Sequence, residues 1–259
     1  MARAPALQAG GQRFESVILH NPGIEPPYSG SIRLPPTRFP HRKKQRTATK
    51  RKIMFRLAVI TSPEKLPEEA HALRIVGNIP KVCALHLRKP GYSENELRLL
   101  IEALPAELRR KIRLHDHFEL CGEYGLQGIH LNHRHPAPPA NIRSLSASCH
   151  NLGEVMEHKR NCDYVFLSPI FDSISKQGYT GKFSPEALSE AAKDGIIDQK
   201  VFALGGVRAQ YIPMLRQWGF GGAAMLGEIW EYYKQNPDLD RFSAHLKNLF
   251  NKIDGKPWI

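Results

Sequence analysis

Histidines are concentrated in one part of this 259-residue chain, where half of its twelve histidines lie between positions 115 and 150. An imidazole titrates near neutral pH, so it can serve as a general acid or base or as a metal ligand. The stretch "HLNHRHPAPP" (130–139) has no carboxylate at ligand spacing, so it does not predict a metal site. The six are His115 and His117, which form an H-x-H pair, then His130, His133, His135 and His150.

His150 is the candidate catalytic residue of this group. It follows the segment "SLSAS" (144–148), which is typical of a buried strand, and an imidazole there can both take and return a proton. A core or surface histidine without a catalytic role is the alternative. The neighbouring Cys149 does not make a dyad with it, because neighbours along a strand point to opposite faces. The cysteines have no C-x-x-C spacing and are expected to be reduced and mostly buried, as in an intracellular protein; they are Cys83, Cys121, Cys149 and Cys162.

Two glycine segments have the composition of a phosphate site. "ALGGV" (203–207) contributes Gly205 and Gly206, and "MLGEIW" (225–230) contributes Gly227. Glycine lets backbone N–H groups approach an anion closely, and a helix N-terminus favours negative charge. An ordinary turn is the alternative for the glycine pair.

A third glycine segment, "GYTGK" (178–182), is too short for a P-loop and is followed by Phe183 where Ser or Thr is required. It is typical of a hinged lid, in which Lys176 reaches an anionic substrate when the loop closes. A solvated polar loop is the alternative.

These residues must be positioned by the alternating elements that begin at Phe55. Helix starts are expected at Ser62 before Pro63, at Ser93 with Glu96 three residues later, and at Ser184 before Pro185. Alternating short apolar runs and helical patterns predict an α/β fold, a (β/α)8 barrel, with an open doubly wound sheet as the runner-up. The eight expected strands are 56–61, 82–88, 111–116, 128–131, 144–148, 164–169, 201–206 and 222–227.

In such a barrel, chemistry collects at the carboxyl ends of the strands. The predicted strand ends form a polar set that is compatible with a phosphorylated ligand. Its members are Thr61, Arg88, His115, Asp116, Asn132, His150, Ser168, Gly205, Gly206 and Gly227.

The basic charge is unevenly distributed. The formal net charge is +12, and residues 1–53 hold eleven Lys and Arg residues but only two Glu. We expect a disordered, basic and Pro-rich extension over 1–53 and a single domain over 54–259. The extension resembles an organelle leader, or the biological start is at Met54 and the extension precedes it. Nucleic-acid binding by the basic run would be nonspecific, and no apolar stretch of about 18 residues predicts a membrane span.

Six separated segments together resemble the thiamine phosphate synthase superfamily. They are "LHLRKPG" (85–91), "LHDHFELCGEYGLQGIHLN" (114–132), "SASCHNLGEV" (146–155), "DYVFLSPIFDSISKQGY" (163–179), "ALGGV" (203–207) and "AAMLGEIW" (223–230). The resemblance implies a (β/α)8 barrel that binds a thiazole phosphate. It assigns the phosphate to Gly205, Gly206 and Gly227, places Lys176 on the loop after the sixth strand, and implies substrate contacts for Arg88, His115, Asp116 and Ser168.

The superfamily has two main branches, and this chain departs from one of them. Synthases join a pyrimidine diphosphate to the thiazole phosphate and hold Mg²⁺ with an Asn-Asp pair and a further Asp. Here His115 stands at the Asn position, Asp116 is kept, and the further Asp corresponds to His135. Pro90 replaces an expected Lys, with Lys89 one step early. Because Mg²⁺ prefers oxygen ligands, these departures weaken the synthase interpretation.

The sister branch is similar to the TenI-like thiazole tautomerases, which need no metal and use a histidine at the position of His150. We therefore expect a cytoplasmic thiazole tautomerase with no cofactor. The alternatives are a Mg²⁺-dependent thiamine phosphate synthase and a noncatalytic thiazole phosphate sensor. A homodimer is a family-level expectation only.

Overall fold

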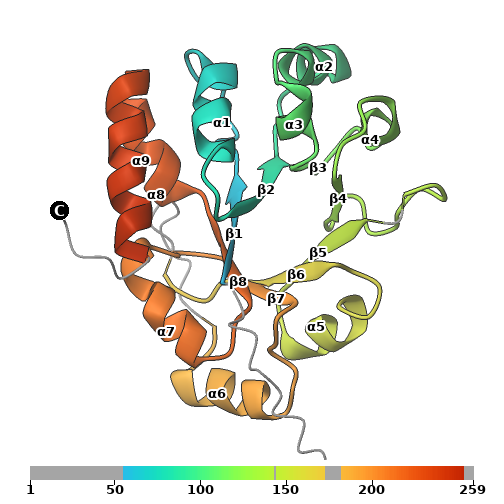
Figure 1. The fold of residues 1–259 in the computed structure, drawn as a ribbon. Coiled ribbons are helices and arrows are strands. Elements are labelled where there is room, and N and C mark those ends of the chain that lie inside the picture. Colours follow the sequence, from blue (N-terminus) through green and yellow to red (C-terminus); the bar gives the residue numbers. More distant parts are fainter. Residues whose placement is uncertain (1–54, 143, 173–181, 254–259) are drawn as a thin grey trace, which may run out of the picture. The chain divides into compact units, whose positions relative to one another are not determined.

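Eight parallel strands close into a barrel in a computed structural model, which describes residues 55–142, 144–172 and 182–253. Each strand pairs with the next along the chain, and β1 also pairs with β8, so the runner-up open sheet is excluded (Figure 1). The prediction of a (β/α)8 barrel is confirmed. The strands are β1 (Arg56–Ile60), β2 (Val82–Leu87), β3 (Ile112–Leu114), β4 (Gly128–Leu131), β5 (Leu145–Cys149), β6 (Tyr164–Leu167), β7 (Val201–Ala203) and β8 (Gly222–Met225).

Helices alternate with the strands and surround them (Figure 1). None of the helices in the described ranges has the length and apolar content of a membrane span. The helices are α1 (Glu69–Gly77), α2 (Glu94–Glu102), α3 (Ala106–Arg109), α4 (Leu120–Glu123), α5 (Leu152–His158), α6 (Pro185–Lys193), the 3₁₀ turn η1 (Ala209–Tyr211), α7 (Ile212–Gln217), α8 (Gly227–Gln235) and α9 (Leu239–Ile253).

Two of the three expected helix starts are found. Ser93 caps α2 in a complete capping box with Glu96, and Ser184 caps α6, whose first residue is a proline. The expected start at Ser62 is wrong, because α1 begins only at Glu69. Pro67 disfavours helical backbone at the preceding residue, which keeps the helix from starting upstream of it.

Alternation along the strands divides the core into two parts. On β1, Leu57 and Val59 belong to the large cluster beneath the helices, whereas Ala58 and Ile60 belong to a smaller cluster inside the barrel. This division follows from the two-residue period of a strand. The inner cluster consists of Ala58, Ile60, Ala84, Tyr164, Phe166, Phe202 and Ala224.

Polar side chains occupy the rest of the barrel interior. The guanidinium of Arg113 donates to Asp163 at 2.6 Å, to Ser144 at 3.0 Å and to Gln127 at 3.1 Å. His130 is fully buried, with its Nδ1 2.9 Å from the Ser146 hydroxyl. Arg113 and His130 need such partners because both side chains are buried from water.

Burial lowers the pKa of His130 to about 3, with a smaller contribution from the nearby charge of Arg113. An unfolded histidine has a pKa of about 6.5, so between pH 6.5 and about 3 the unfolded chain binds a proton that the folded chain excludes. The neutral histidine therefore favours the folded state above pH 6.5, and this stability is lost as the pH falls toward 3.

We predict that His130→Gln flattens the acid limb of the stability curve. Between pH 7 and pH 5, the wild type should lose about 2 kcal/mol more unfolding free energy than the variant, in urea titrations with a chelator present. His71→Gln, at an exposed site on α1, is the control and should keep the wild-type pH dependence. Parallel curves for wild type and His130→Gln would contradict the prediction.

Gly222 on β8 lies close to neighbouring backbone and ring atoms, which leads to a second prediction. A Cβ added at Gly222 would lie 2.5 Å from the carbonyl oxygen of Arg56 and 2.8 Å from ring carbons of Phe202. Gly222→Ala should therefore lower the unfolding free energy by about 1–3 kcal/mol. Gly122→Ala in α4 meets nothing within 4 Å and should leave stability unchanged or slightly raised. Equal denaturation midpoints for the two variants would show that β8 tolerates the added methyl.

Candidate functional site

A pocket of about 1030 Å³ opens at the carboxyl ends of the strands. Its wall is formed largely by the last inward-facing residue of successive strands, as expected for a barrel of this kind. Glu64, Glu231 and Lys234 lie at the same pocket, and Lys234 pairs with both carboxylates at 2.7 and 3.2 Å. The strand-end residues of the wall include Ile60, Arg88, His115, Asn132, His150, Ser168, Leu204 and Leu226.

His150 lies at this pocket, directly after β5. Its backbone N–H donates to the Glu154 carboxylate at 2.6 Å, and Asn151 caps α5 by accepting from the backbone of Glu154. The His150 Nδ1 is 3.3 Å from the carbonyl oxygen of Ser168. The Ser168 hydroxyl is 3.4 Å from the same nitrogen, so the carbonyl accepts from the Nδ1–H tautomer and the hydroxyl can donate to the other one. Ser168 therefore holds the His150 ring at the pocket in either tautomer, and the Nδ1–H form has its lone pair on Nε2.

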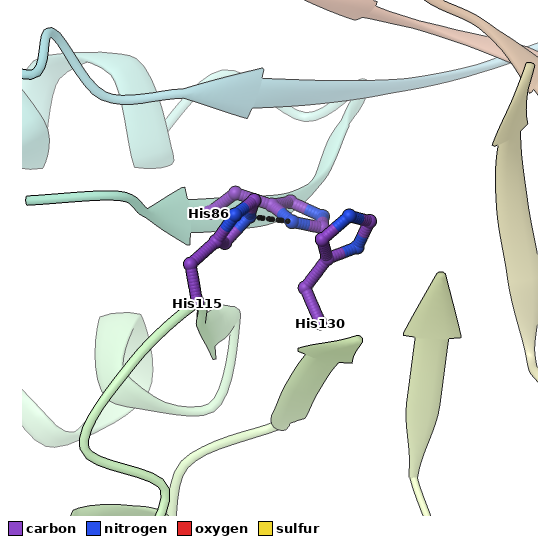
Figure 2. Close-up of side chains that lie close together, drawn as sticks. All are labelled: His86, His115 and His130. Atoms are coloured by element: carbon purple, nitrogen blue, oxygen red, sulfur yellow. Dashed lines mark hydrogen bonds between the residues drawn. The ribbon is translucent and has the colours of Figure 1, made fainter. Parts of the chain in front are cut away.

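Three histidines lie close together here (Figure 2): His115 and His130 line the pocket, and His86 is fully buried against them. The His86 Nδ1 lies 3.0 Å from the His115 Nε2, and the His115 and His130 rings stack with centroids 4.3 Å apart. Burial lowers the pKa of His86 and of His115 well below the ordinary value, with the neighbouring His130 adding to the effect. All three rings are therefore neutral at physiological pH.

Sequence reasoning missed His86, which completes this group. It precedes Arg88 by two residues and alternates with Ala84, so all three positions share the inward face of β2. Strand alternation was the signal that could have placed it in the pocket with Arg88. Its second nitrogen, Nε2, is 2.7 Å from the hydroxyl of Tyr164.

Lys89 does not take the place of the pocket lysine that the family resemblance leads us to expect at position 90. Its ammonium is buried between strand and helix, where it pairs with Glu69 and donates to the carbonyl oxygen of Glu64 at 2.7 Å. Burial lowers its pKa, and the Glu69 carboxylate opposes that effect. Because Lys89 stands one residue before the expected position, its side chain lies on the opposite face of the strand end.

Asp116 is held by two neighbours at the edge of the site. Its carboxylate is 3.0 Å from the Arg134 guanidinium and 3.1 Å from the His135 Nε2. His115 and His135 stand at the positions that the family resemblance assigns to the other two oxygen ligands of Mg²⁺. Both side chains offer nitrogen instead. One carboxylate that is already paired does not fit a cation that prefers several oxygen ligands.

The predicted phosphate glycines have a structural requirement of their own. Gly205 and Gly206 adopt φ values of 93° and 61°, which side-chain-bearing residues rarely adopt. A Cβ on Gly206 would also lie 2.2 Å from the carbonyl oxygen of Asp172. Gly227 is the first residue of α8. Their phosphate contacts remain a prediction.

The remaining predicted positions fall in different places. Ser168 is buried at the pocket wall beside His150, and Arg88 lies on the same wall. Thr61 is buried away from it, with its hydroxyl bonded to the backbone of Arg88. Lys176, the glycine lid and the basic extension lie outside the described residues.

Known proteins resemble this chain over the barrel. The family model described as thiamine monophosphate synthase matches residues 57–229. The thiamine-phosphate synthase of Histophilus somni is 26% identical over 125 residues, covering 45% of this chain and 56% of that protein. The corresponding protein of Bacteroides thetaiotaomicron is 26% identical over 142 residues, covering 51% of this chain and 68% of that protein. The chain therefore spans little more than half of the first of these relatives.

A solved structure agrees with these matches. The crystal structure of thiamine phosphate pyrophosphorylase from Bacteroides thetaiotaomicron superposes with a TM-score of 0.67 and 35% sequence identity, over 79% of this chain and 100% of that chain. The family match and this relative, together with the closed barrel and its pocket, show that the chain belongs to the thiamine monophosphate synthase and TenI superfamily.

Proposed function

We propose that this chain is a thiamine-biosynthesis enzyme that binds a thiazole phosphate and catalyses a proton shift within it. The observation that carries the proposal is the position of His150, which lies at the pocket with its Nδ1 beside the carbonyl and hydroxyl oxygens of Ser168. In the tautomer that donates to the carbonyl, Nε2 carries the lone pair. Such an imidazole is suited to take a proton from one position of the ring and return it to another.

The proposed reaction leaves the proton count unchanged. His150 Nε2 removes a proton from the non-aromatic carboxythiazole phosphate, and the imidazolium then delivers that proton to a second position, which leaves an aromatic ring. The Ser168 carbonyl accepts from Nδ1–H in both states and stabilises the cation between the two steps. No other catalytic group is required for this cycle.

Two features of the pocket support binding of a phosphorylated heterocycle. Apolar side chains of Phe166, Leu204 and Leu226 line one part of the wall, against which a flat ring can pack. Arg88 and the N-terminus of α8 at Gly227 supply positive charge for anionic groups. Held by its phosphate, the ring would stay within reach of His150 during proton transfer.

The second candidate is the synthase reaction, which the printed names of the curated relatives favour. The side chains at the expected Mg²⁺ positions, His115, Asp116 and His135, argue against this reaction, because two of the three offer nitrogen rather than oxygen. Among the described residues, Arg88, Arg134 and Lys234 are cations of the pocket, and Arg134 pairs with Asp116 while Lys234 pairs with Glu64 and Glu231. A noncatalytic sensor would use the same contacts without turnover.

We predict that the chain aromatises carboxythiazole phosphate without added metal and that His150→Gln lowers kcat by about 10²–10⁴-fold. Proton NMR of the product measures this turnover. His133→Gln, at another histidine of the pocket wall, is the matched control and should keep kcat within a few-fold of the parent. Equal rates for His150→Gln and wild type would remove His150 from the mechanism.

Adding pyrimidine diphosphate and Mg²⁺ to the same assay separates the candidate functions. We expect no thiamine phosphate and no release of diphosphate, since the usual oxygen ligands are replaced by imidazoles. Formation of thiamine phosphate only with Mg²⁺ would establish the synthase instead. Saturable thiazole phosphate binding by calorimetry, with no product of either reaction, would indicate the sensor.

A further inference from the structure

His86, His115 and His130 bring three imidazoles together (Figure 2); His115 and His130 line the pocket floor, and His86 is buried directly behind them. His86 is on β2, His115 follows β3, and His130 is on β4, so the group spans three adjacent strands. One nitrogen from each ring lies within 4.8 Å of the others. This arrangement differs from the acidic edge near Asp116, and the proton-shift proposal does not use it.

The spacing is compatible with one shared ion. Nitrogens at about 2.1 Å from a tetrahedral Zn²⁺ lie about 3.4 Å from one another. The His86 Nδ1 and His115 Nε2 are 3.0 Å apart and would need to separate only slightly. His130 would need to move closer and rotate, because its ring now stacks on that of His115 at 22° with centroids 4.3 Å apart, and its centroid lies 5.1 Å from that of His86.

Hydrogen bonds fix the orientation of the His130 and His86 rings, as hydrogen bonds from neighbouring groups do for histidine ligands in metal sites. The Ser146 hydroxyl donates to the carbonyl oxygen of Ile129 at 3.3 Å, so it accepts from His130 Nδ1–H at 2.9 Å. The lone pair of His130 is therefore on Nε2, where the Ser148 hydroxyl at 2.9 Å now donates to it. The Tyr164 hydroxyl is hydrogen-bonded to His86 Nε2, so His86 Nδ1 is the nitrogen that faces the other two rings.

We propose that these three histidines bind one borderline transition-metal ion of the Zn²⁺ class, with the fourth position open to the pocket. Imidazole suits zinc, cobalt and nickel, and three histidines with one open position is a ligand set of catalytic zinc. Ion binding would require His86 to carry its proton on Nε2, donated to the Tyr164 hydroxyl, and His115 to move its own proton from Nε2 to Nδ1, while Ser148 would give up its bond to His130 Nε2.

The charges around the group define the fourth ligand. Arg113 is compensated by Asp163 and Arg134 by Asp116, whereas Arg88 adds positive charge beside His115. No carboxylate belongs to the group itself. A divalent ion there keeps a surplus of positive charge, and its open position therefore favours an anion, either hydroxide or an anionic group of the ligand.

Metal titration of the full, untagged chain tests the site without reference to turnover. After chelator treatment, the chain should bind one Zn²⁺, and Co²⁺ should give the visible absorption bands of a tetrahedral ion. His86→Gln and His130→Gln should each weaken binding by at least about 100-fold, and Tyr164→Phe, which keeps all three ligands, by about 10- to 100-fold. His133→Gln, outside the group but on the pocket wall, is the control and should bind like the parent.

Circular dichroism and thermal unfolding check that each variant folds, and His115→Gln at the strand end replaces any that does not. Unchanged affinity in the folded ligand variants would overturn the proposal, as would the absence of stoichiometric binding in the parent. Because the readout is binding of the ion alone, failure here is distinguishable from failure of the proton-shift assay.

Discussion

Closure of the barrel is the constraint on which the rest of the structure depends. Eight parallel strands in sequence order force alternate side chains into one enclosed interior, and the polar ones among them must bind one another. In this chain they are unequally divided. Strands β2 to β6 contribute the buried histidine, arginine, serine and tyrosine side chains of the interior, beside Ala84 and Phe166. The buried apolar side chains from β1, β7 and β8 are Ala58, Ile60, Phe202 and Ala224. The interior therefore has a hydrogen-bonded side and an apolar side.

The pocket continues this division at its mouth. Arg88, His115 and His150 extend the polar side, and Leu204 and Leu226 extend the apolar side. A ligand with a flat ring and anionic groups meets both kinds of surface at once. The arrangement is a consequence of strand alternation, since each wall residue continues the inward series of its own strand.

Much of this organisation is predictable from the sequence, and the exceptions have physical reasons. The apolar runs identify all eight strands, with ends that differ by up to three residues because hydrophobicity does not report where strand pairing stops. Ser62 fails as a helix start because Pro67 intervenes. His86 was missed because the spacing of the histidines alone ignores strand faces, although its two-residue offset from Arg88 marks the same face. Lys89, one residue from Arg88, lies on the other face, in agreement with its early position in the sequence.

Replacing oxygen ligands by imidazoles changes what the pocket can do. Hard cations such as Mg²⁺ lose their preferred donors, while neutral nitrogen donors accumulate at the floor. His130 and Ser148 are hydrogen-bonded, and Ser148 precedes His150 on the same inward face of β5. The imidazole group and His150 therefore line one continuous surface. If the proposed ion binds at the floor, an anion in the pocket would meet both that ion and the base at the wall, so metal binding and proton transfer would be compatible within one pocket.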